Sequence, residues 1–422
     1  MVRAMRPLRV VLCFAGLIIA YLLLYSLRRR YGHSFSGPGL PGAASRSRRE
    51  WLLAALGTGQ FVAFGPFQLN SASGQSDPEV LPLVTPVELA VATCGERVEG
   101  TMTMLKSAVL FAQHPIKVHI FADESLHRSL SDLLEKWPDT FRRRMNASLY
   151  PITFPDGQDK EWRHLFKLCA SERLFLPSLL KDTDSLIYVD TDVLFLEPVE
   201  KLWSKFAQFG PLHLAGLAPE HEDPKAGWYA RFARHPFYGR AGVNSGVMLM
   251  NLSRLRAASY KTDMSPLRLH WDEVLWPLFR KYRFNITWGD QDLINIIFHF
   301  NPEFLYEFDC AWNYRPDHCM YGSACPAAED KGVSVLHGNR GVLYDAKNPA
   351  FRAIYQALRD FPWGGDVVQD LLDPLDQALS SAENTQCGRL SAQFTQGLRR
   401  TIVGYRAGWF GRRDVFGDVS KV

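Results

Sequence analysis

The segment Ser185–Pro198 reads SLIYVDTDVLFLEP and decides the fold class of this chain. Its apolar first half is typical of a buried parallel strand, and the strand is expected to end at Asp190. Further apolar runs lie at residues 87–93, 118–122, 246–251 and 333–336, and helical segments are expected at residues 99–113 and 160–180, with Pro177 ending the second. Strands that alternate with helical segments predict an α/β domain with a single, mostly parallel, doubly wound sheet flanked by helices.

Asp190 and Asp192 are the sharpest chemical feature, because they lie one residue apart where this strand ends. Ligands of open α/β sheets collect at the carboxyl ends of the strands, and carboxylate oxygens suit Mg²⁺ or Mn²⁺. A turn with two exposed acids is the plainer interpretation of such a pair. The apolar residues on both sides argue against that interpretation, since two buried charges without a counter-ion are costly.

His337 follows the late apolar run VSVL and begins the segment HGNRG. The glycines after it, Gly338 and Gly341, would let the backbone approach a ligand closely. A lone histidine is usually structural. If its strand ends near Asp192, however, His337 completes an Asp/Asp/His set, and an imidazole ligand favours Mn²⁺ over Mg²⁺.

Two further polar clusters adjoin apolar segments, and one arginine lies on a helical stretch before the Asp190 strand. Asn244-Ser245-Gly246 adjoins GVMLMNL, and Gly289-Asp290-Gln291-Asp292 adjoins LINIIF, so the polar groups there are candidates for binding sugar hydroxyls. Asp290 is also a candidate for capping the helix that follows it. Arg173 lies in the helical stretch before the Asp190 strand. Its side chain is expected either to face the site around Asp190 or to be a solvated surface residue.

Composition limits the class of protein. The 422 residues are 47% hydrophobic and 22% charged, which excludes wholesale disorder and a polytopic membrane protein. Lys and Arg total 48 and Asp and Glu total 44, so the net charge is +4. That surplus is too small to indicate a nucleic-acid-binding protein, and we expect no nucleic-acid partner.

The N-terminal region predicts a membrane anchor and a lumenal stem. Val10–Leu27 (VVLCFAGLIIAYLLLYSL) is an 18-residue run without a formal charge, flanked by arginines, and is interpreted as a single transmembrane signal-anchor. A cleaved signal peptide is the rival interpretation, although its apolar region is usually shorter. The expected organisation is a cytoplasmic tail at 1–9, a lumenal stem at 28–84, a catalytic domain at 85–375 and a C-terminal tail at 376–422.

Sequons and cysteines agree with a lumenal location. Asn146, Asn251 and Asn285 each begin an N-x-[ST] sequon, which predicts glycosylation if they face the secretory lumen. Six cysteines lie beyond the predicted anchor: Cys94, Cys169, Cys310, Cys319, Cys325 and Cys387. Three of them, Cys310, Cys319 and Cys325, lie close together in a Gly- and Pro-containing stretch. This spacing favours a loop closed by local disulfides, with free thiols or a zinc site as alternatives. The apolar stretch Trp51–Phe67 within the stem has no evident role.

Five motifs together resemble the family-8 glycosyltransferases. They are YVDTDVLFLEP, GVNSGVMLMNL, NITWGDQDLINIIF, WNYRPDHCMYG and VSVLHGNRGV, and the resemblance covers about residues 87–375. More narrowly, the chain resembles the glucoside α-1,3-xylosyltransferases that act on O-linked glucose of EGF-like repeats in Notch-type proteins. The resemblance implies a GT-A fold of Rossmann type, UDP-xylose as the donor and Mn²⁺ as the cofactor, with Mg²⁺ as a possible substitute. It also implies a type II membrane protein of the Golgi or endoplasmic reticulum, with a lumenal catalytic domain.

The same resemblance assigns roles to residues by motif position. It implies that Asp190, Asp192 and His337 bind the metal, and that Gln291 lies under the anomeric carbon of the donor. The remaining donor contacts that it implies are Ala92, Thr93 and Cys94 at the uridine, Arg173, Asn244 and Asp290 at the sugar, and Thr191, Ser245, Gly246 and Gly338 nearby. Family members often have a glycine and a lysine three and six residues after the histidine, where this chain has Arg340 and Leu343. Arg340 and Lys347 are therefore the candidates for neutralising the diphosphate.

The resemblance implies retention of anomeric configuration, with Gln291 and Asp290 as the catalytic pair. An amide is a poor nucleophile, so we favour substitution on one face of the sugar over a double displacement. Trp288 or Trp312 are candidates for excluding hexoses, and a loop rich in aromatic residues is either an acceptor surface or ordinary packing: Trp228, Tyr229, Phe232, Phe237 and Tyr238. A related transferase that uses UDP-glucose or UDP-glucuronate, a silent lumenal sugar-binding protein and a metal-dependent phosphohydrolase are the other functions considered.

Overall fold

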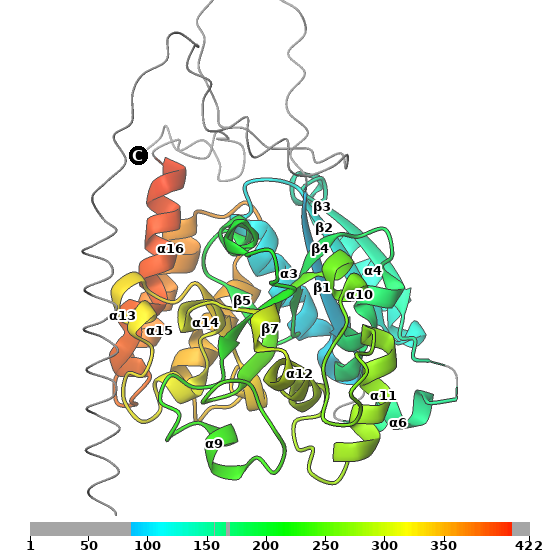
Figure 1. Ribbon diagram of the computed structural model, residues 1–422. Coiled ribbons are helices and arrows are strands. Elements are labelled where there is room, and N and C mark those ends of the chain that lie inside the picture. The colour runs from blue at the N-terminus through cyan, green and yellow to red at the C-terminus, as the bar shows by residue number, and fades with distance from the viewer. Residues whose placement is uncertain (1–85, 156, 166–168, 407–422) are drawn as a thin grey trace, which may run out of the picture. The chain divides into compact units, whose positions relative to one another are not determined.

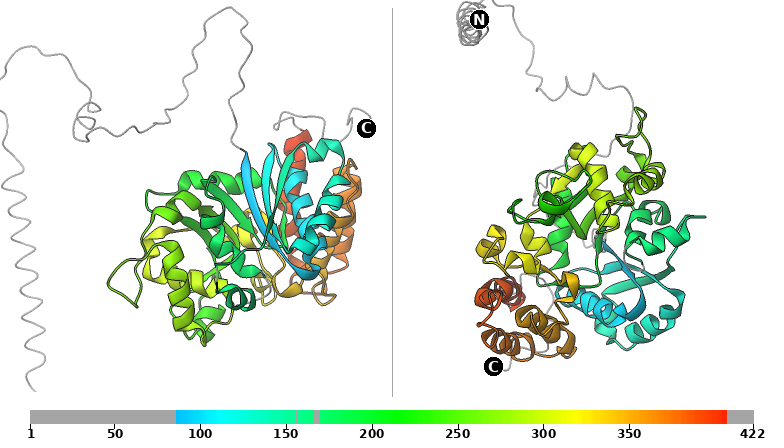
Figure 2. Two further views of the ribbon diagram at one scale, coloured as in Figure 1. Left: turned by 90° about the vertical axis from the view of Figure 1, so that its right-hand side faces the viewer. Right: turned by 90° about the horizontal axis from the view of Figure 1, so that it is seen from below.

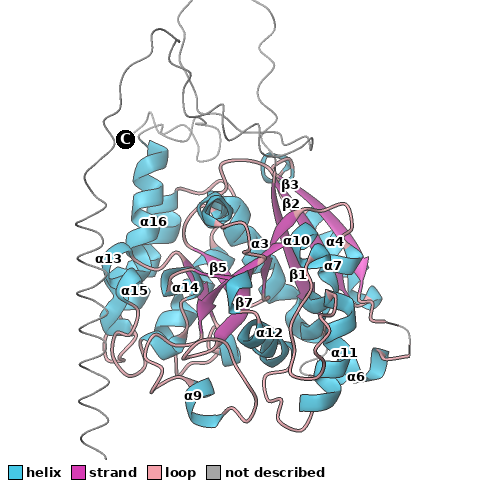
Figure 3. Ribbon diagram, viewed as in Figure 1, coloured by secondary structure: helices cyan, strands magenta, loops and turns pink. Residues whose placement is uncertain are grey.

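A seven-stranded mixed sheet forms the centre of the fold in a computed structural model that describes residues 86–155, 157–165 and 169–406 (Figures 1 and 3). Its strand order is β3-β2-β1-β4-β7-β6-β8. The strands are β1 (Val87–Thr93), β2 (Ile116–Ala122), β3 (Met145–Pro151), β4 (Ser185–Val189), β6 (Ala215–Pro219), β7 (Val243–Asn251) and β8 (Leu305–Glu307). Four neighbouring pairs are parallel and two, both involving β7, are antiparallel. The prediction of a mostly parallel α/β sheet is confirmed.

The prediction of a single sheet is wrong. β5 (Val193–Phe195) and β9 (Val335–His337) form a separate two-stranded antiparallel sheet, in which Val193 lies opposite His337. β5 begins directly after Asp192, so the chain leaves the central sheet at the two aspartates. Through this small sheet, His337 at the end of β9 is brought next to the aspartates that follow β4.

Two apolar cores cover the two faces of the central sheet. Successive residues of β1 alternate between them: Leu89 and Val91 belong to one core, and Ala90 and Ala92 to the other. The first core packs beneath α3 (Val98–Phe111), α14 (Pro349–Asp360), α15 (Asp373–Ser380) and α16 (Ser391–Arg406). The second packs beneath α10 (Leu252–Ala257), α11 (Trp271–Tyr282) and α12 (Asp290–Phe300). Figure 2 shows these two helical layers on opposite sides of the sheet.

The remaining helices lie in the connections between these elements, and all but one of them have six residues or fewer. They are α4 (Glu124–Glu135), α5 (Asp139–Arg142), α6 (Asp159–His164), α7 (Leu176–Leu179), α8 (Val199–Trp203), α9 (Trp228–Phe232) and α13 (Pro326–Lys331). The single helix expected at 160–180 is instead divided into α6, the 3₁₀ helix Ala170–Phe175 and α7. Pro177 lies in the first turn of α7 rather than at a helix end, which suits a residue without a backbone N–H.

The boundary expected at residue 376 differs from the structure. Of the segment interpreted as a tail, residues 376–406 complete α15 and form α16, and Leu379, Phe394 and Leu398 are fully buried in the first core. A disulfide joins Cys387 to Cys319, and both cysteines are buried in that core. The folded domain therefore extends to at least residue 406.

All six cysteines form disulfides, so the free-thiol and zinc alternatives do not hold. Cys310–Cys325 closes a local loop of the kind expected. The other two, Cys94–Cys169 and Cys319–Cys387, join residues 75 and 68 positions apart, which the spacing of the cysteines could not reveal. Three disulfides are consistent with folding in an oxidising compartment.

Several expectations concern residues outside the part of the chain that the structure describes. The proposed anchor Val10–Leu27, the stem and the apolar stretch Trp51–Phe67 all lie there. Within the described residues, none of the helices has the length and apolarity needed to span a bilayer. Of the three sequons, Asn146 is exposed on β3, Asn251 caps α10 through its side chain, and Asn285 donates a hydrogen bond to the Arg234 carbonyl.

Candidate active site

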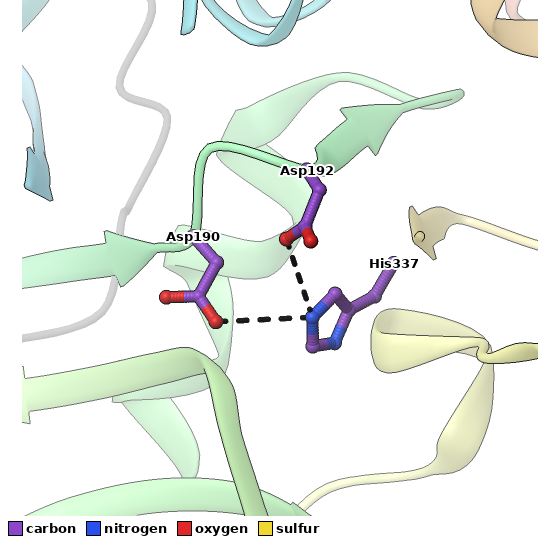
Figure 4. A group of neighbouring side chains, drawn as sticks. All are labelled: Asp190, Asp192 and His337. Carbon is purple, nitrogen blue, oxygen red and sulfur yellow. Dashed lines mark ion pairs between the residues drawn. The ribbon is translucent and has the colours of Figure 1, made fainter. Parts of the chain in front are cut away.

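Asp190, Asp192 and His337 meet between the end of β4 and the end of β9 (Figure 4). One ligand atom from each of these residues lies within 4.8 Å of the other two. The His337 Nε2 atom lies 3.8 Å from Asp190 Oδ2 and 3.5 Å from Asp192 Oδ1. The expected convergence of two acids and one imidazole is thus confirmed, and the β5–β9 pairing is its structural cause.

A chain of hydrogen bonds fixes which His337 nitrogen faces the carboxylates. Asn244 Oδ1 accepts from the Gly246 N–H and also from Asn313 Nδ2, at 3.1 and 2.9 Å. The other amide atom of Asn313, its oxygen, therefore faces His337 Nδ1 at 2.9 Å, so Nδ1 carries the proton. The lone pair of Nε2 then points toward two carboxylate oxygens. Three acceptor atoms that face one another suit a shared divalent cation.

Gly246 is required for this arrangement. A Cβ atom at this position would lie 2.1 Å from His337 Cε1 and 2.6 Å from Nδ1. The imidazole therefore rests directly on the backbone of β7, and any side chain would displace it. The Gly246 carbonyl also accepts a hydrogen bond from the Asp190 N–H at 2.9 Å, which ties one carboxylate to the same backbone.

Arg173 is a buried cation that joins the two acidic parts of the site. Its side chain is 4% exposed, so the solvated-surface interpretation is wrong. Nη2 donates to Asp190 Oδ1 at 2.6 Å, and Nε forms an ion pair with Asp290 Oδ2 at 2.8 Å. Burial works against the charged form, but the two carboxylates outweigh it and raise the pKa of Arg173. The guanidinium remains charged and lies over the Tyr188 ring.

Asp290 presents a carboxylate oxygen that no described residue satisfies by a hydrogen bond. Asp290 is 2% exposed, and the Arg173 Nε–H points at the Ala170 carbonyl rather than at Oδ2. Burial raises the pKa of Asp290 to about 7 although Arg173 opposes the shift. Gly289, not Asp290, is the N-cap residue of α12, so the capping interpretation does not explain the acid. A buried acceptor of this kind suits a bound hydroxyl group.

Gln291 is held in one orientation by a relay that begins at Asp292. Asp292 is fully buried, and its Oδ1 accepts from the Tyr229 hydroxyl at 2.7 Å. Because the Tyr229 proton is used there, the hydroxyl oxygen accepts from Gln291 Nε2 at 3.2 Å. Gln291 Oε1 therefore faces the other way and accepts from the Ser245 N–H at 3.1 Å. The Ser245 hydroxyl also donates to Oε1, at a longer 3.5 Å.

The other residues expected at the donor lie on the neighbouring segments of the chain. Thr191 lies between the two aspartates, and the Gly338 N–H donates to the Asp192 carbonyl at 2.7 Å. Ala92, Thr93 and Cys94 end β1, where the Thr93 hydroxyl accepts from that of Thr101 and Cys94 is held by its disulfide.

The candidate cations and tryptophans lie in different surroundings. Arg340 Nη2 donates to Asp317 at 2.6 Å, and the Arg340 side chain is 49% exposed. Lys347 is exposed in the loop before α14. The Trp288 ring lies 5.7 Å from the Trp228 ring, next to Gln291, whereas Trp312 packs beneath Lys205 in the first core.

Three residues with evident roles in the site were not singled out from the sequence in those roles. Asn313 orients His337, Asp292 anchors the relay, and Tyr229 transmits it to Gln291. Each lay inside a quoted motif or the aromatic loop. Their roles depend on contacts between distant segments, so spacing along the chain carries no signal for them.

The chain belongs to glycosyltransferase family 8, because the family model described as "Glycosyl transferase family 8" matches residues 88–337. The fold is accordingly a GT-A-type glycosyltransferase fold, and the Asp-x-Asp site suits a divalent metal. Such an enzyme takes a nucleotide sugar as donor and, in this group, a glycoprotein as acceptor.

Several relatives within the family are named glucoside xylosyltransferase 1 or 2. "Glucoside xylosyltransferase 1" of Gallus gallus is 54% identical over 316 residues, which are 75% of this chain and 72% of that protein. The Homo sapiens protein of the same name is 54% identical over 322 residues, 76% of this chain and 73% of that protein. Among solved structures, mouse xyloside xylosyltransferase 1 in its apo form matches with a TM-score of 0.42 at 20% identity, over 61% of this chain and 98% of that one.

Proposed function

We propose that this chain is a retaining glucoside α-1,3-xylosyltransferase that transfers xylose from UDP-xylose to O-linked glucose on EGF-like repeats of Notch-type proteins. The relatives named glucoside xylosyltransferase, at 54% identity over three quarters of the chain, support xylosyl transfer to a glucoside. The observation that carries the chemistry is the meeting of Asp190, Asp192 and His337, with His337 Nε2 unprotonated.

The residues present fit a divalent cation, with Mn²⁺ favoured over Mg²⁺ because one ligand is an imidazole. Asp190, Asp192 and His337 would hold it, and Asn313 and Gly246 keep the imidazole in place. When bound, the metal supplies Lewis-acid stabilisation of the negative charge that grows on the departing diphosphate. This charge would develop near Arg173, whose guanidinium donates a hydrogen bond to Asp190, and that contact supports the assignment.

The donor would lie across the carboxyl ends of the strands. We assign the uridine to the end of β1, at Ala92, Thr93 and Cys94, and the xylose to Arg173, Asn244 and Asp290. The buried Asp290 oxygen that makes no hydrogen bond supports this assignment, because a sugar hydroxyl would supply the missing donor. The backbone at Thr191, Ser245, Gly246 and Gly338 would line the remaining space.

Transfer would proceed on one face of the sugar. The bond between the anomeric carbon and the phosphate oxygen breaks, the glucose hydroxyl oxygen bonds to that carbon, and its proton passes to the departing phosphate. Gln291 contributes through Oε1, whose dipole stabilises positive charge on the sugar. The Asp292–Tyr229 relay keeps Oε1, rather than the amide nitrogen, on the side of Ser245.

We place the catalytic domain in the lumen of the Golgi or endoplasmic reticulum, anchored by residues 10–27, with residues 1–9 cytoplasmic and residues 28–84 as the stem. Three disulfides support an oxidising compartment. Among the sequons, Asn146 is the most accessible and is expected to carry a glycan if the domain is lumenal. Digestion with an N-glycosidase, followed by a gel-mobility measurement, tests this location.

The decisive assay uses the full-length protein in detergent with a glucosylated EGF domain as acceptor. UDP-xylose, UDP-glucose and UDP-glucuronate are compared as donors by UDP release, each with Mn²⁺ and with a chelator. Release from UDP-xylose that requires both Mn²⁺ and the acceptor supports the proposal. Turnover with another donor would change the assigned sugar, and Mn²⁺-dependent UDP binding without any turnover would indicate a silent sugar-binding protein.

A further inference from the structure

The described chain contains a strongly basic surface beside the site, formed by residues 225–240 and 280–284, which we call the basic rim. Residues 225–240 (KAGWYARFARHPFYGR) contain four basic and no acidic side chains, and residues 280–284 (RKYRF) contain three basic and none acidic. The whole chain has a net charge of only +4. Basic residues are therefore concentrated in these two segments, whereas basic and acidic residues are nearly equal in number over the rest of the chain.

Two hydrogen bonds hold the parts of the basic rim together. Asn285 Nδ2 donates to the Arg234 carbonyl at 2.7 Å, and His299 Nδ1 contacts the Phe237 carbonyl at 2.8 Å. These contacts join the loop around α9 to the end of α11 and to α12, and Figure 1 shows α9 below α12. The two basic segments therefore form one surface rather than two unrelated loops.

Most charges of the basic rim are exposed and form no ion pair within the described chain, the exception being Lys281, which is paired with Asp263. Arg231, Arg234, Arg240 and Arg283 are exposed, and none has an ion pair with a carboxylate of the described residues. Two large apolar side chains stand beside them: Phe232 is 52% exposed and Phe284 is 84% exposed. Glu222 and Asp223 lie at the start of the loop, and among the described residues neither forms an ion pair with these four arginines; Asp223 Oδ1 accepts from the Lys225 N–H.

The basic rim is continuous with the acceptor side of the site. The Tyr229 hydroxyl of α9 accepts a hydrogen bond from Gln291. The neighbouring Trp228 ring lies 5.7 Å from the ring of Trp288, which precedes Gln291 by three residues. A glucose unit that reaches Gln291 would therefore bring whatever carries it onto the basic rim. Glucose is neutral and small, so it cannot itself use several arginines spread over two segments.

We propose that the basic rim docks an acidic face of the protein that carries the acceptor glucose, an inference that rests on the proposed function. Unmatched like charges repel one another and are costly to keep together unless a partner uses them. Exposed aromatic side chains flanked by arginines are typical of protein-binding surfaces. Charge complementarity at such a surface raises the rate of encounter and makes it depend on ionic strength.

The test compares a protein acceptor with a small one. The double charge reversal Arg231→Glu/Arg234→Glu is made in the full-length protein, with Arg231→Gln/Arg234→Gln as the milder variant. Arg128→Glu/Lys136→Glu, on and just after α4, is the matched control for the same change in net charge. Each protein is assayed with UDP-xylose and either a glucosylated EGF domain or an aryl β-glucoside.

We expect kcat/KM for the EGF domain to fall about tenfold or more in the reversed variant, mainly through KM, and less in the glutamine variant. Activity on the aryl glucoside should stay within about twofold of wild type, because electrostatic docking acts on the protein partner alone. The control pair should change neither. An equal loss on both acceptors, or no loss on the EGF domain, would overturn the proposal.

Binding without turnover separates this proposal from the catalytic one. Association of the glucosylated EGF domain is measured directly, without donor, at low and high salt. Salt-sensitive binding that weakens on charge reversal supports the basic rim even if no sugar is transferred. Unchanged binding to the EGF domain, together with reduced binding to phosphatidylserine vesicles, would show instead that the surface meets a membrane and would refute the proposal.

Discussion

Two histidine–carboxylate clusters lie at opposite ends of the central sheet and differ in what faces the carboxylate. At the amino end of β1, Glu88 Oε2 is 2.7 Å from His119 Nε2, 3.2 Å from Lys117 Nζ and 3.1 Å from the Thr183 hydroxyl. At the other end, Asp190, Asp192 and His337 direct acceptor atoms at one another, 3.5 Å or more apart. The same residue types are thus arranged for stability in one cluster and for a ligand in the other.

The electrostatics of the Glu88 cluster agree with a structural role. Burial alone would raise the pKa of Glu88, but hydrogen bonds and charge from His119 and Lys117 more than offset it and lower the pKa. The ionised form is therefore already stabilised by the protein. In the other cluster, Asp190 forms an ion pair with Arg173, which also pairs with Asp290. The hydrogen-bond donors and cations around each carboxylate, rather than the residue types, therefore distinguish a structural cluster from a ligand-binding one.

Asp192→Asn should have the largest effect on activity. It removes a ligand oxygen and should lower kcat by about 10³-fold or more, because a bound metal contributes several kcal/mol to the transition state. The melting temperature without metal should be unchanged or higher, since one of two adjacent negative charges is lost. Melting curves with and without Mn²⁺ provide the check: a variant that Mn²⁺ still stabilises as much as wild type would contradict the assignment.

Gly246→Ala should reduce activity by about 10²-fold, because a displacement near 1 Å in a catalytic group has effects of this size. The new Cβ would lie 2.1 Å from the His337 ring, which must move. Gly210→Ala is the matched control, since its Cβ would meet its nearest neighbour at an ordinary 3.7 Å. The measurement is the steady-state kinetics of both variants. Equal activities of Gly246→Ala and Gly210→Ala would show that the position of the His337 imidazole is unimportant.

Tyr229→Phe should lower kcat by about tenfold, the loss expected from one hydrogen bond, and leave the KM for the donor nearly unchanged. In a Gln291→Ala background the same substitution should have no further effect, because Tyr229 acts through Gln291. Tyr260→Phe, which removes a buried hydroxyl bonded to the Leu255 carbonyl, is the control and should not affect turnover. Additive losses in the double variant would show that Tyr229 works independently of Gln291.

Glu88→Gln should leave kcat unchanged and lower the free energy of unfolding by about 1–2 kcal/mol, as expected for a charged hydrogen-bonded group. Because the pKa of Glu88 is lowered from its usual 4.5 in the folded protein, its contribution is present above that pH. It is lost as the pH falls through the folded-state pKa. Denaturant unfolding at pH 7 and pH 3 tests this: the difference between variant and wild type should shrink at the lower pH.

The sequence was most informative where one segment carries the whole signal. β1 has the bounds predicted for it, and Asp190 and Asp192 follow a buried strand as expected. His337 was identified because it ends an apolar run before glycines. The β5–β9 sheet was not predicted, since strands of three residues are too short to show a periodicity.

Other parts could not be predicted because they depend on distant contacts. Asn313 gains its role only by lying between Asn244 and His337, and Asp292 only by meeting Tyr229. The C-terminal segment looked polar overall, yet its few apolar residues lie on the faces of α15 and α16 that pack against the first core. Average composition concealed this amphipathic pattern.

Mn²⁺ binding by wild type and His337→Ala, measured by calorimetry in the presence of UDP, tests the central claim most directly. One Mn²⁺ per chain should bind to the wild type, and binding should be lost or weakened by about 10-fold or more without the imidazole, as is typical for removal of a metal ligand or its support. His119→Ala, at the other end of the sheet, should bind Mn²⁺ as the wild type does. Equal Mn²⁺ affinity of wild type and His337→Ala would contradict the claim that these three side chains form the metal site.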